Sequence, residues 1–141
     1  MANMANTAAY RLSDGRMAVD VDSAKALTAD DCGFVQKVIA DAVTITLPSV
    51  GAGLNYTFLN GGAKVTNGPV GTGSNGSVAL TVSPAAADKI QGGVGGTATA
   101  NKDLVNTKAT SRAGLDELSI VGGATTAWSV TSIKGVWARE A

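Results

Sequence analysis

The chain has 141 residues, of which 45% are hydrophobic and only 16% are charged, with 11 basic and 11 acidic residues in balance. The hydrophobic share is enough for one domain with a core, and it excludes a chain that is disordered throughout. The basic residues are spread singly from Arg11 to Arg139, whereas a nucleic-acid partner normally requires a basic stripe. A charge-poor surface is cheaper to take out of water, so this composition favours a structural or protein-binding role.

The rare or absent residue types disfavour further classes of protein. Cys32 is the only cysteine and there is no histidine, so no intrachain disulfide can form and a zinc site is disfavoured. No apolar run approaches the ~18 residues of a membrane span, and we expect no membrane partner. The first residues lack the basic segment and apolar run of a signal peptide, so we expect that they do not form one.

The N-terminal residues differ from the rest of the chain. They read Met-Ala-Asn-Met-Ala-Asn-Thr-Ala-Ala, which is small, polar and without a useful period. We predict a flexible N-terminal arm over residues 1–9, which contains Met4, followed by one domain over residues 10–141. The arm either becomes ordered on a partner or simply frays.

From Tyr10 onward, hydrophobic residues recur at every second position, which is typical of half-buried strands. The clearest runs begin at Met17, Val43, Leu54, Val78, Leu118 and Trp128, and weaker ones lie near residues 34–39, residues 104–107 and Val136. Turn dipeptides such as Asn60-Gly61 separate the runs. Roughly eight to ten short strands of this kind predict an all-β, single-domain β-sandwich or barrel. Of the two, we predict an antiparallel β-sandwich.

The alternation also predicts the core. The inward positions are Val43, Ile45, Leu47, Leu54, Tyr56, Phe58, Val78, Leu80, Val82, Ile120, Trp128 and Val130. Helix signals are few. Residues 28–31 form a capping box that supports one turn. Residues 83–88 predict about two helical turns, because Ser83 can cap a helix that starts at Pro84.

One familiar motif occurs, the G-x-G-x-x-G pattern over residues 71–76. A dinucleotide site needs a strand before this motif and a helix that begins at it. Here Gly68-Pro69 precedes the motif and a strand-like alternation follows. We therefore interpret residues 61–76 as one long exposed loop or a loose hairpin, and expect no cofactor.

The acidic residues also fail to form a chemical pattern. Asp20 and Asp22 alternate within a strand run and are expected on its solvent face rather than at a metal. The plentiful Ser and Thr lack a histidine base, and Glu117 and Glu140 are poor candidates for a glycosidase pair. We expect neither a metal site nor catalytic residues, so the chain is predicted not to be an enzyme.

The order of several segments is more informative than any single motif. The segments are residues 26–33 (ALTADDCG), 34–38 (FVQKV), 43–48 (VTITLP), 53–58 (GLNYTF), 88–92 (DKIQG), 106–110 (NTKAT), 114–119 (GLDELS), 127–130 (AWSV) and 134–138 (KGVWA). This order resembles that of tailed-bacteriophage capsid decoration (cement) proteins, in which L-T-x-x-D-x-G, V-T-L-P, G-x-x-Y-x-F and W-x-V…G-x-W segments recur. The resemblance covers about residues 24–138. It departs at Gly114-Leu115-Asp116, where such proteins often have Gly-Asp.

The resemblance implies a β-sandwich, with a jelly roll as one form of it. It also implies a virion protein on the outer capsid surface, made in the host cytoplasm. Its partner would be the major capsid protein, whose neighbouring subunits it would clamp, and binding only the assembled shell would stabilise that shell. It implies no catalytic residues. A receptor- or carbohydrate-binding module of a phage head or tail fibre is the alternative, and an enzyme is the least favoured class.

We expect a homo-oligomer, with a dimer favoured over a trimer because two-fold assemblies are the commonest. Four residues are candidates for subunit or capsid contacts, namely Met4, Tyr10, Trp137 and Arg139. Trp128 is expected in the core. Trp137 lies in a terminal strand, which is often an edge strand, so it is either a lid on the core or an anchor in an interface.

Overall fold

The computed structural model describes residues 9–51, 53–64 and 76–140. The first eight residues of the predicted arm, and Met4 with them, lie outside the described residues. So do residues 65–75, which hold most of the predicted long loop and all of the G-x-G-x-x-G motif except Gly76.

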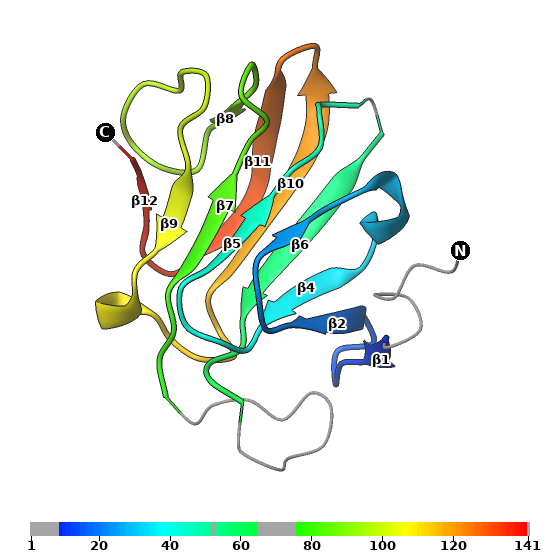
Figure 1. The fold of residues 1–141 in the computed structure, drawn as a ribbon, viewed down its shortest axis with the longest axis vertical. Coiled ribbons are helices and arrows are strands. Elements are labelled where there is room, and N and C mark those ends of the chain that lie inside the picture. Colours follow the sequence, from blue (N-terminus) through cyan, green and yellow to red (C-terminus); the bar gives the residue numbers. More distant parts are fainter. Residues whose placement is uncertain (1–8, 52, 65–75, 141) are drawn as a thin grey trace.

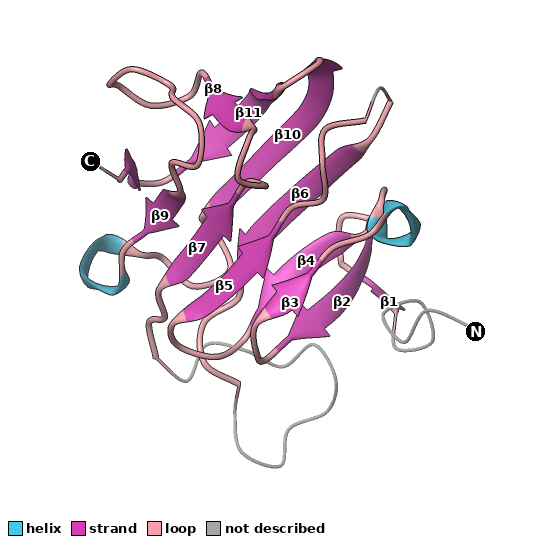
Figure 2. Ribbon diagram, turned by 45° about the horizontal axis from the view of Figure 1, so that its top comes forward, coloured by secondary structure: helices cyan, strands magenta, loops and turns pink. Residues whose placement is uncertain are grey.

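The described chain forms two β-sheets that lie face to face (Figures 1 and 2). Sheet A contains β1 (Tyr10–Arg11), β2 (Met17–Val21), β4 (Val35–Val38), β6 (Asn55–Asn60), β10 (Glu117–Ala124), β11 (Ala127–Lys134) and β8 (Lys89–Gln91), in that spatial order. Sheet B contains β12 (Trp137–Arg139), β9 (Leu104–Asn106), β7 (Leu80–Ser83), β5 (Val43–Thr46) and β3 (Lys25–Ala26). The predicted all-β sandwich is confirmed.

The strand directions differ from the prediction. From β2 to β9 the chain alternates between the two sheets, so that strands two apart in sequence become neighbours in one sheet, except that β8 pairs with β11 rather than with β6. The pairs β2–β4 and β4–β6 in sheet A, and β3–β5 and β5–β7 in sheet B, are parallel, as is β8–β11. The expectation of an antiparallel sandwich is therefore wrong for these pairs. A jelly roll, which is built from antiparallel Greek keys, does not describe this chain order.

The core lies between the sheets. All of the predicted core residues contribute to it, although Leu54 and Val130 are only partly buried and pack against its margin. Trp128 is fully buried and its ring centroid lies 5.6 Å from that of Tyr56, at an interplanar angle of 55°. The tilted arrangement is the one that aromatic pairs favour.

The two described helical turns are both 3₁₀. The predicted capping box is confirmed at η1 (Ala29–Asp31), where Thr28 Oγ1 accepts from Asp30 N and Asp31 Oδ2 accepts from Thr28 N. The second turn is η2 (Lys108–Thr110).

The helix predicted over residues 83–88 is wrong. Ser83 ends β7 and a turn leads to β8. The buried carboxylate of Asp88 accepts from Val50 N at 3.0 Å, so it binds the neighbouring loop rather than continuing a helix.

A second, smaller apolar cluster lies on the outer face of sheet A. Ala18, Val35 and Leu59 are buried there, and Tyr10 and Leu12 pack against them. Tyr10 also donates a hydrogen bond of 2.5 Å to Asp20 Oδ1. The short strand β1 and the turn after it therefore cover part of this face, and Tyr10 belongs to the folded domain.

Candidate functional site

The outer face of sheet B is formed by small polar and apolar side chains from its described strands. Side chains alternate across a strand, so the residues between the core positions of β3, β5, β7, β9 and β12 point away from the core. They are Ala26, Thr44, Thr46, Thr81, Ser83, Val105 and Ala138. We call this set the Thr/Ser face. The described strands of sheet B place no charged side chain on it.

The strand register aligns these residues into rows. Thr44 pairs with Thr81, which pairs with Val105 on the next strand. Thr46 pairs with Ser83. Threonine and valine are β-branched and lose little further freedom at χ1 when they are covered. The face is therefore pre-ordered, and its short hydroxyls are far cheaper to desolvate than charged groups.

The outer face of sheet A has a different character. Its register places charged residues in one row, from Asp20 and Lys37 across Leu59 to Glu117 and Lys134. Arg16 donates two hydrogen bonds to the carboxylate of Glu117, at 2.8 and 3.0 Å. These bonds, more than the one to Asp14, raise the pKa of the Arg16 guanidinium above its usual value. Moving such charged groups out of water and into an interface costs free energy.

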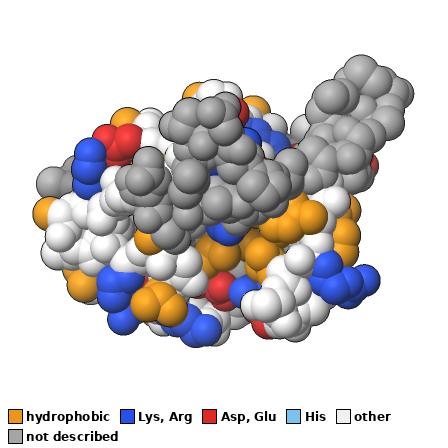
Figure 3. Space-filling model, turned by 90° about the horizontal axis from the view of Figure 1, so that it is seen from below, with side chains coloured by type: hydrophobic (Ala, Val, Ile, Leu, Met, Phe, Trp, Pro, Cys, Tyr) orange, Lys and Arg blue, Asp and Glu red, His pale blue; other side chains and the backbone are white. Residues whose placement is uncertain are grey.

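A shallow depression of about 340 Å³ lies at this charged row. Leu12, Leu59 and Leu115 contribute apolar walls, and Lys37 and Lys134 contribute cationic ones. The view in Figure 3, from below relative to Figure 1, shows Lys and Arg side chains separated from one another by uncharged and hydrophobic ones. The depression thus combines both signs of charge with leucine side chains.

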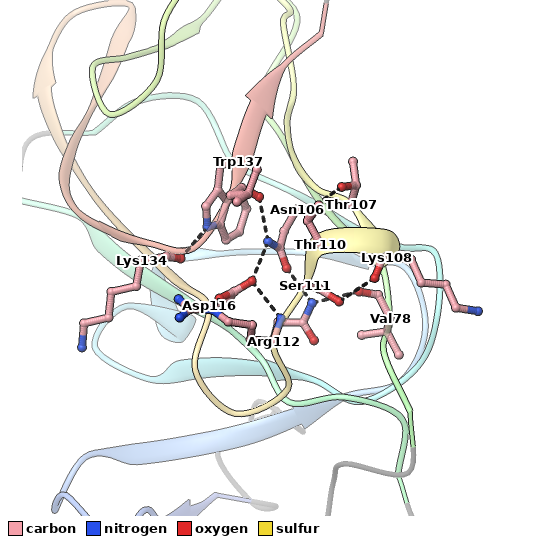
Figure 4. Close-up of polar contacts among 12 residues, drawn as sticks. Val78, Asn106, Thr107, Lys108, Thr110, Ser111, Arg112, Asp116, Lys134 and Trp137 are labelled. Atoms are coloured by element: carbon pink, nitrogen blue, oxygen red, sulfur yellow. Dashed lines mark hydrogen bonds and ion pairs between the residues drawn. The ribbon is translucent and has the colours of Figure 1, made fainter.

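A buried polar network lies at the end of the sandwich where β6 ends and β10 begins (Figure 4). Asn106 Nδ2 donates to Asp116 Oδ2 at 3.0 Å, and its Oδ1 accepts from Asn60 at 2.7 Å. Asp116 also accepts from the backbone N and the Nε of Arg112, at 3.0 and 2.9 Å. Asn60, Asn106 and Asp116 are each fully buried.

The partners in this network are all within the chain. Asn60 donates to Val78 O and accepts from Gly62 N, and Asn106 also donates to Val136 O. A buried carboxylate with three donors is well satisfied. The network therefore connects β6, β9 and the segments that lead into β7, β10 and β12, and we interpret it as structural.

The predicted contact residues are dispersed by the fold. Tyr10 lies half-buried on the outer face of sheet A, and burial is the largest cause of the raised pKa of its hydroxyl. Trp137 is 7% exposed, belongs to the core, and donates from Nε1 to Lys134 O at 2.9 Å. Of its two predicted roles, the structure therefore places it as a lid on the core rather than as an exposed anchor.

Arg139 takes up a different position. It is half-buried, donates to Ile90 O across the gap between the sheets, and lines a second depression of about 280 Å³ with Gly95 and Gly96. Tyr10, Trp137 and Arg139 do not form one surface, and the sequence prediction missed the Thr/Ser face. The signal for that face is the Thr-x-Thr spacing of residues 44–46 and the Thr-x-Ser spacing of residues 81–83, which fill the positions between the core residues.

Among the described residues, no group of three or more His, Cys, Asp or Glu side chains is placed to hold a metal ion. In the same part of the chain, no helix is long and apolar enough to cross a membrane. Comparison of the chain with protein-family models, with curated proteins and with solved structures finds no match in any of the three.

Proposed function

We propose that this chain is a non-catalytic decoration protein of a tailed-phage capsid, and that it docks on the shell through the Thr/Ser face of sheet B. The observation that carries the proposal is the absence of charge from the outward side chains of the described strands of sheet B. The ordered segments that resemble decoration proteins support the phage assignment.

The choice between the two faces follows from desolvation. The centre of a protein interface is depleted in charged residues, because an imperfectly paired charge is costly to bury. The Thr/Ser face meets that condition, whereas the outer face of sheet A carries Lys37, Glu117 and Lys134 in one row. Sheet A would then face solvent on the particle.

The proposed mechanism is thermodynamic linkage. A protein that binds across neighbouring capsid subunits, and only in the assembled shell, stabilises the shell by its binding free energy. The domain would need no moving part for this role, and its rigid β-branched surface would lose little conformational entropy on docking.

The test is a binding assay on particles of the encoding phage that lack this protein. Thr46→Lys and Thr81→Lys each introduce a charge on the Thr/Ser face. Ser132→Lys is the matched control, because Ser132 is exposed on the outer face of sheet A. We expect co-sedimentation of the wild type and the control with the particles, and loss of it for both threonine variants. Equal binding by all four proteins would exclude the Thr/Ser face as the docking surface.

The alternative function, a module of a head or tail fibre, is tested with purified phage particles. A shell protein should occur at a copy number that follows the capsid lattice, and a fibre module only at the few fibre positions. Quantitative mass spectrometry of purified particles measures this ratio directly.

A further inference from the structure

Three polar side chains meet between the sheets at the end of the core beside β3. Lys25 comes from the edge strand β3 of sheet B, Gln36 from β4 of sheet A, and Asp31 from η1 between them. Lys25 Nζ lies 2.7 Å from Gln36 Oε1 and 3.3 Å from Asp31 Oδ1. Gln36 is fully buried and Asp31 is 2% exposed, whereas the Lys25 side chain is 23% exposed, so the carboxylate and the carboxamide are the parts shielded from water.

Local structure fixes the carboxylate. Asp31 Oδ2 accepts from Thr28 N at 2.9 Å in the capping box, which turns Oδ1 toward Lys25. The amide nitrogen of Gln36 is held less firmly, because its bond to Phe34 O is 3.4 Å long, near the upper limit for a hydrogen bond. An amine, a carboxylate and a carboxamide with a loosely held nitrogen are thus aligned in a protected site.

We propose that this trio forms an intramolecular amide cross-link between Lys25 and Gln36, with Asp31 as the proton carrier. The carbonyl carbon of Gln36 lies one C=O bond behind the oxygen that Lys25 Nζ already contacts. Holding an amine and an acyl group in contact replaces a bimolecular collision with an intramolecular step. This inference does not depend on the proposed function.

The reaction balances without a co-reactant. Lys25 Nζ passes a proton to Asp31 and attacks Cδ of Gln36, which forms the Nζ–Cδ bond and places negative charge on Oε1. Asp31 then returns the proton to Nε2 as the Cδ–Nε2 bond breaks. The second Nζ proton leaves with the departing nitrogen, so that a lysine ammonium and a primary amide become a secondary amide and ammonium. Asp31 ends as it began, a carboxylate.

The cross-link would join the two sheets at a short edge strand. Strand β3 has two residues and pairs with β5 alone in the described sheet. A covalent bond from Lys25 to Gln36 would close a short chain loop and restrict the unfolded chain, as a disulfide does. It would also survive reducing conditions, unlike a disulfide.

The experiment is intact-mass spectrometry of the full chain, purified folded and then denatured, with allowance for removal of the initiator Met. We expect the wild type to be lighter than its sequence by one ammonia, and a digest to contain one branched peptide that joins Lys25 to Gln36. Lys25→Arg and Gln36→Met should each show their full sequence mass. Lys37→Arg is the control, because Lys37 follows Gln36 on the opposite side of β4, and it should retain the mass loss.

Two mass measurements would overturn the proposed cross-link. A wild-type mass equal to the sequence mass after prolonged incubation of the folded protein would overturn it, and would leave the trio as an ordinary ion pair. A loss of one water instead of ammonia would also overturn it, because the acyl donor would then be the Asp31 carboxyl. Since the wild type alone decides the matter, a variant that fails to fold does not obscure the result.

Discussion

Trp128 is the largest fully buried side chain, and it packs against Tyr56 at the centre of the core. Replacing it by alanine leaves a large cavity, so Trp128→Ala should lower the free energy of unfolding by about 3–5 kcal/mol. Urea unfolding followed by circular dichroism measures the change. Val136→Ala is the control, because Val136 is 58% exposed, and it should change stability by no more than about 0.5 kcal/mol. Equal effects of the two substitutions would contradict the assignment of Trp128 to the core.

The two tyrosines, Tyr10 and Tyr56, are the only ones in the chain, and both have a raised pKa. For Tyr56, burial first and then the nearby Cys32 and Asp31 raise the pKa to about 12. We predict that the tyrosinate absorbance of the folded protein stays flat through pH 10 and increases only near pH 12. The urea-unfolded protein should titrate near the ordinary value of about 10. A normal titration of either tyrosine in the folded state would refute this.

The same shifts give a stability prediction. Because the folded-state pKa lies above the unfolded value, the neutral tyrosines contribute stability in full below about pH 10. That contribution is lost as the pH rises toward the folded pKa of about 12 for Tyr56. The free energy of unfolding should therefore decline in this alkaline range, and Tyr56→Phe should reduce the decline.

The sequence predicts the burial of some residues and not of others. The apolar core positions were predictable, because period-two alternation reports which side of a strand is buried. The buried polar residues were not predictable, because Asn60, Asn106 and Asp116 are of types that usually occur in exposed turns. Asn106 lies 46 positions after Asn60 and 10 positions before Asp116, so only the folded structure brings the three together.

At the scale of elements, the turn into β12 depends on Gly135. Its φ is +93°, and a Cβ there would clash with the carboxylate of Asp116. Gly135→Ala should unfold the domain or lower its melting temperature by many degrees, because the clash disturbs the buried network. Thermal unfolding followed by circular dichroism measures the effect.

Gly114 provides the matched control for that substitution. It also has a positive φ, +78°, but no atom lies within 4 Å of the position that a Cβ would take. Gly114→Ala should therefore cost only the backbone strain, about 1–2 kcal/mol. If the two alanine variants are equally stable, the contact with Asp116 is not what requires glycine at 135.

Short elements explain most of the differences between prediction and structure. β1 and β3 have two residues each and β8 has three. Strands of this length are too short to show an alternating pattern of hydrophobic residues. The helix signal at Ser83 and Pro84 was overridden, because Ser83 completes the parallel pairing of β7 with β5. Tertiary pairing of this kind regularly outweighs a capping preference.

For the whole molecule, the two-sheet architecture followed from the sequence, but the strand directions did not. A half-buried strand shows the same alternation whether its neighbour is parallel or antiparallel. The described sheets also end in short strands, with β1 and β8 at the edges of sheet A and β3 and β12 at those of sheet B. Short edges discourage strand-to-strand association, so we expect assembly through faces instead.

The homo-oligomer remains a prediction at this scale, with a dimer favoured over a trimer. Sedimentation equilibrium of the purified chain, over a range of concentrations, determines the state in solution. A chain that is monomeric both in solution and on the particle would contradict the prediction. Thr46→Lys should leave the oligomer intact if the Thr/Ser face is reserved for the shell.

The most direct test of the proposed function is a cryo-electron-microscopy map of the particle that the encoding phage produces. We predict density for the two-sheet domain on the outer surface of the shell, repeated with the icosahedral lattice. The Thr/Ser face of sheet B should face the capsid subunits, and the charged row of sheet A should face solvent. Density for the domain only at a tail or fibre, a shell without it, or a shell contacted through Lys37, Glu117 and Lys134 would contradict the account.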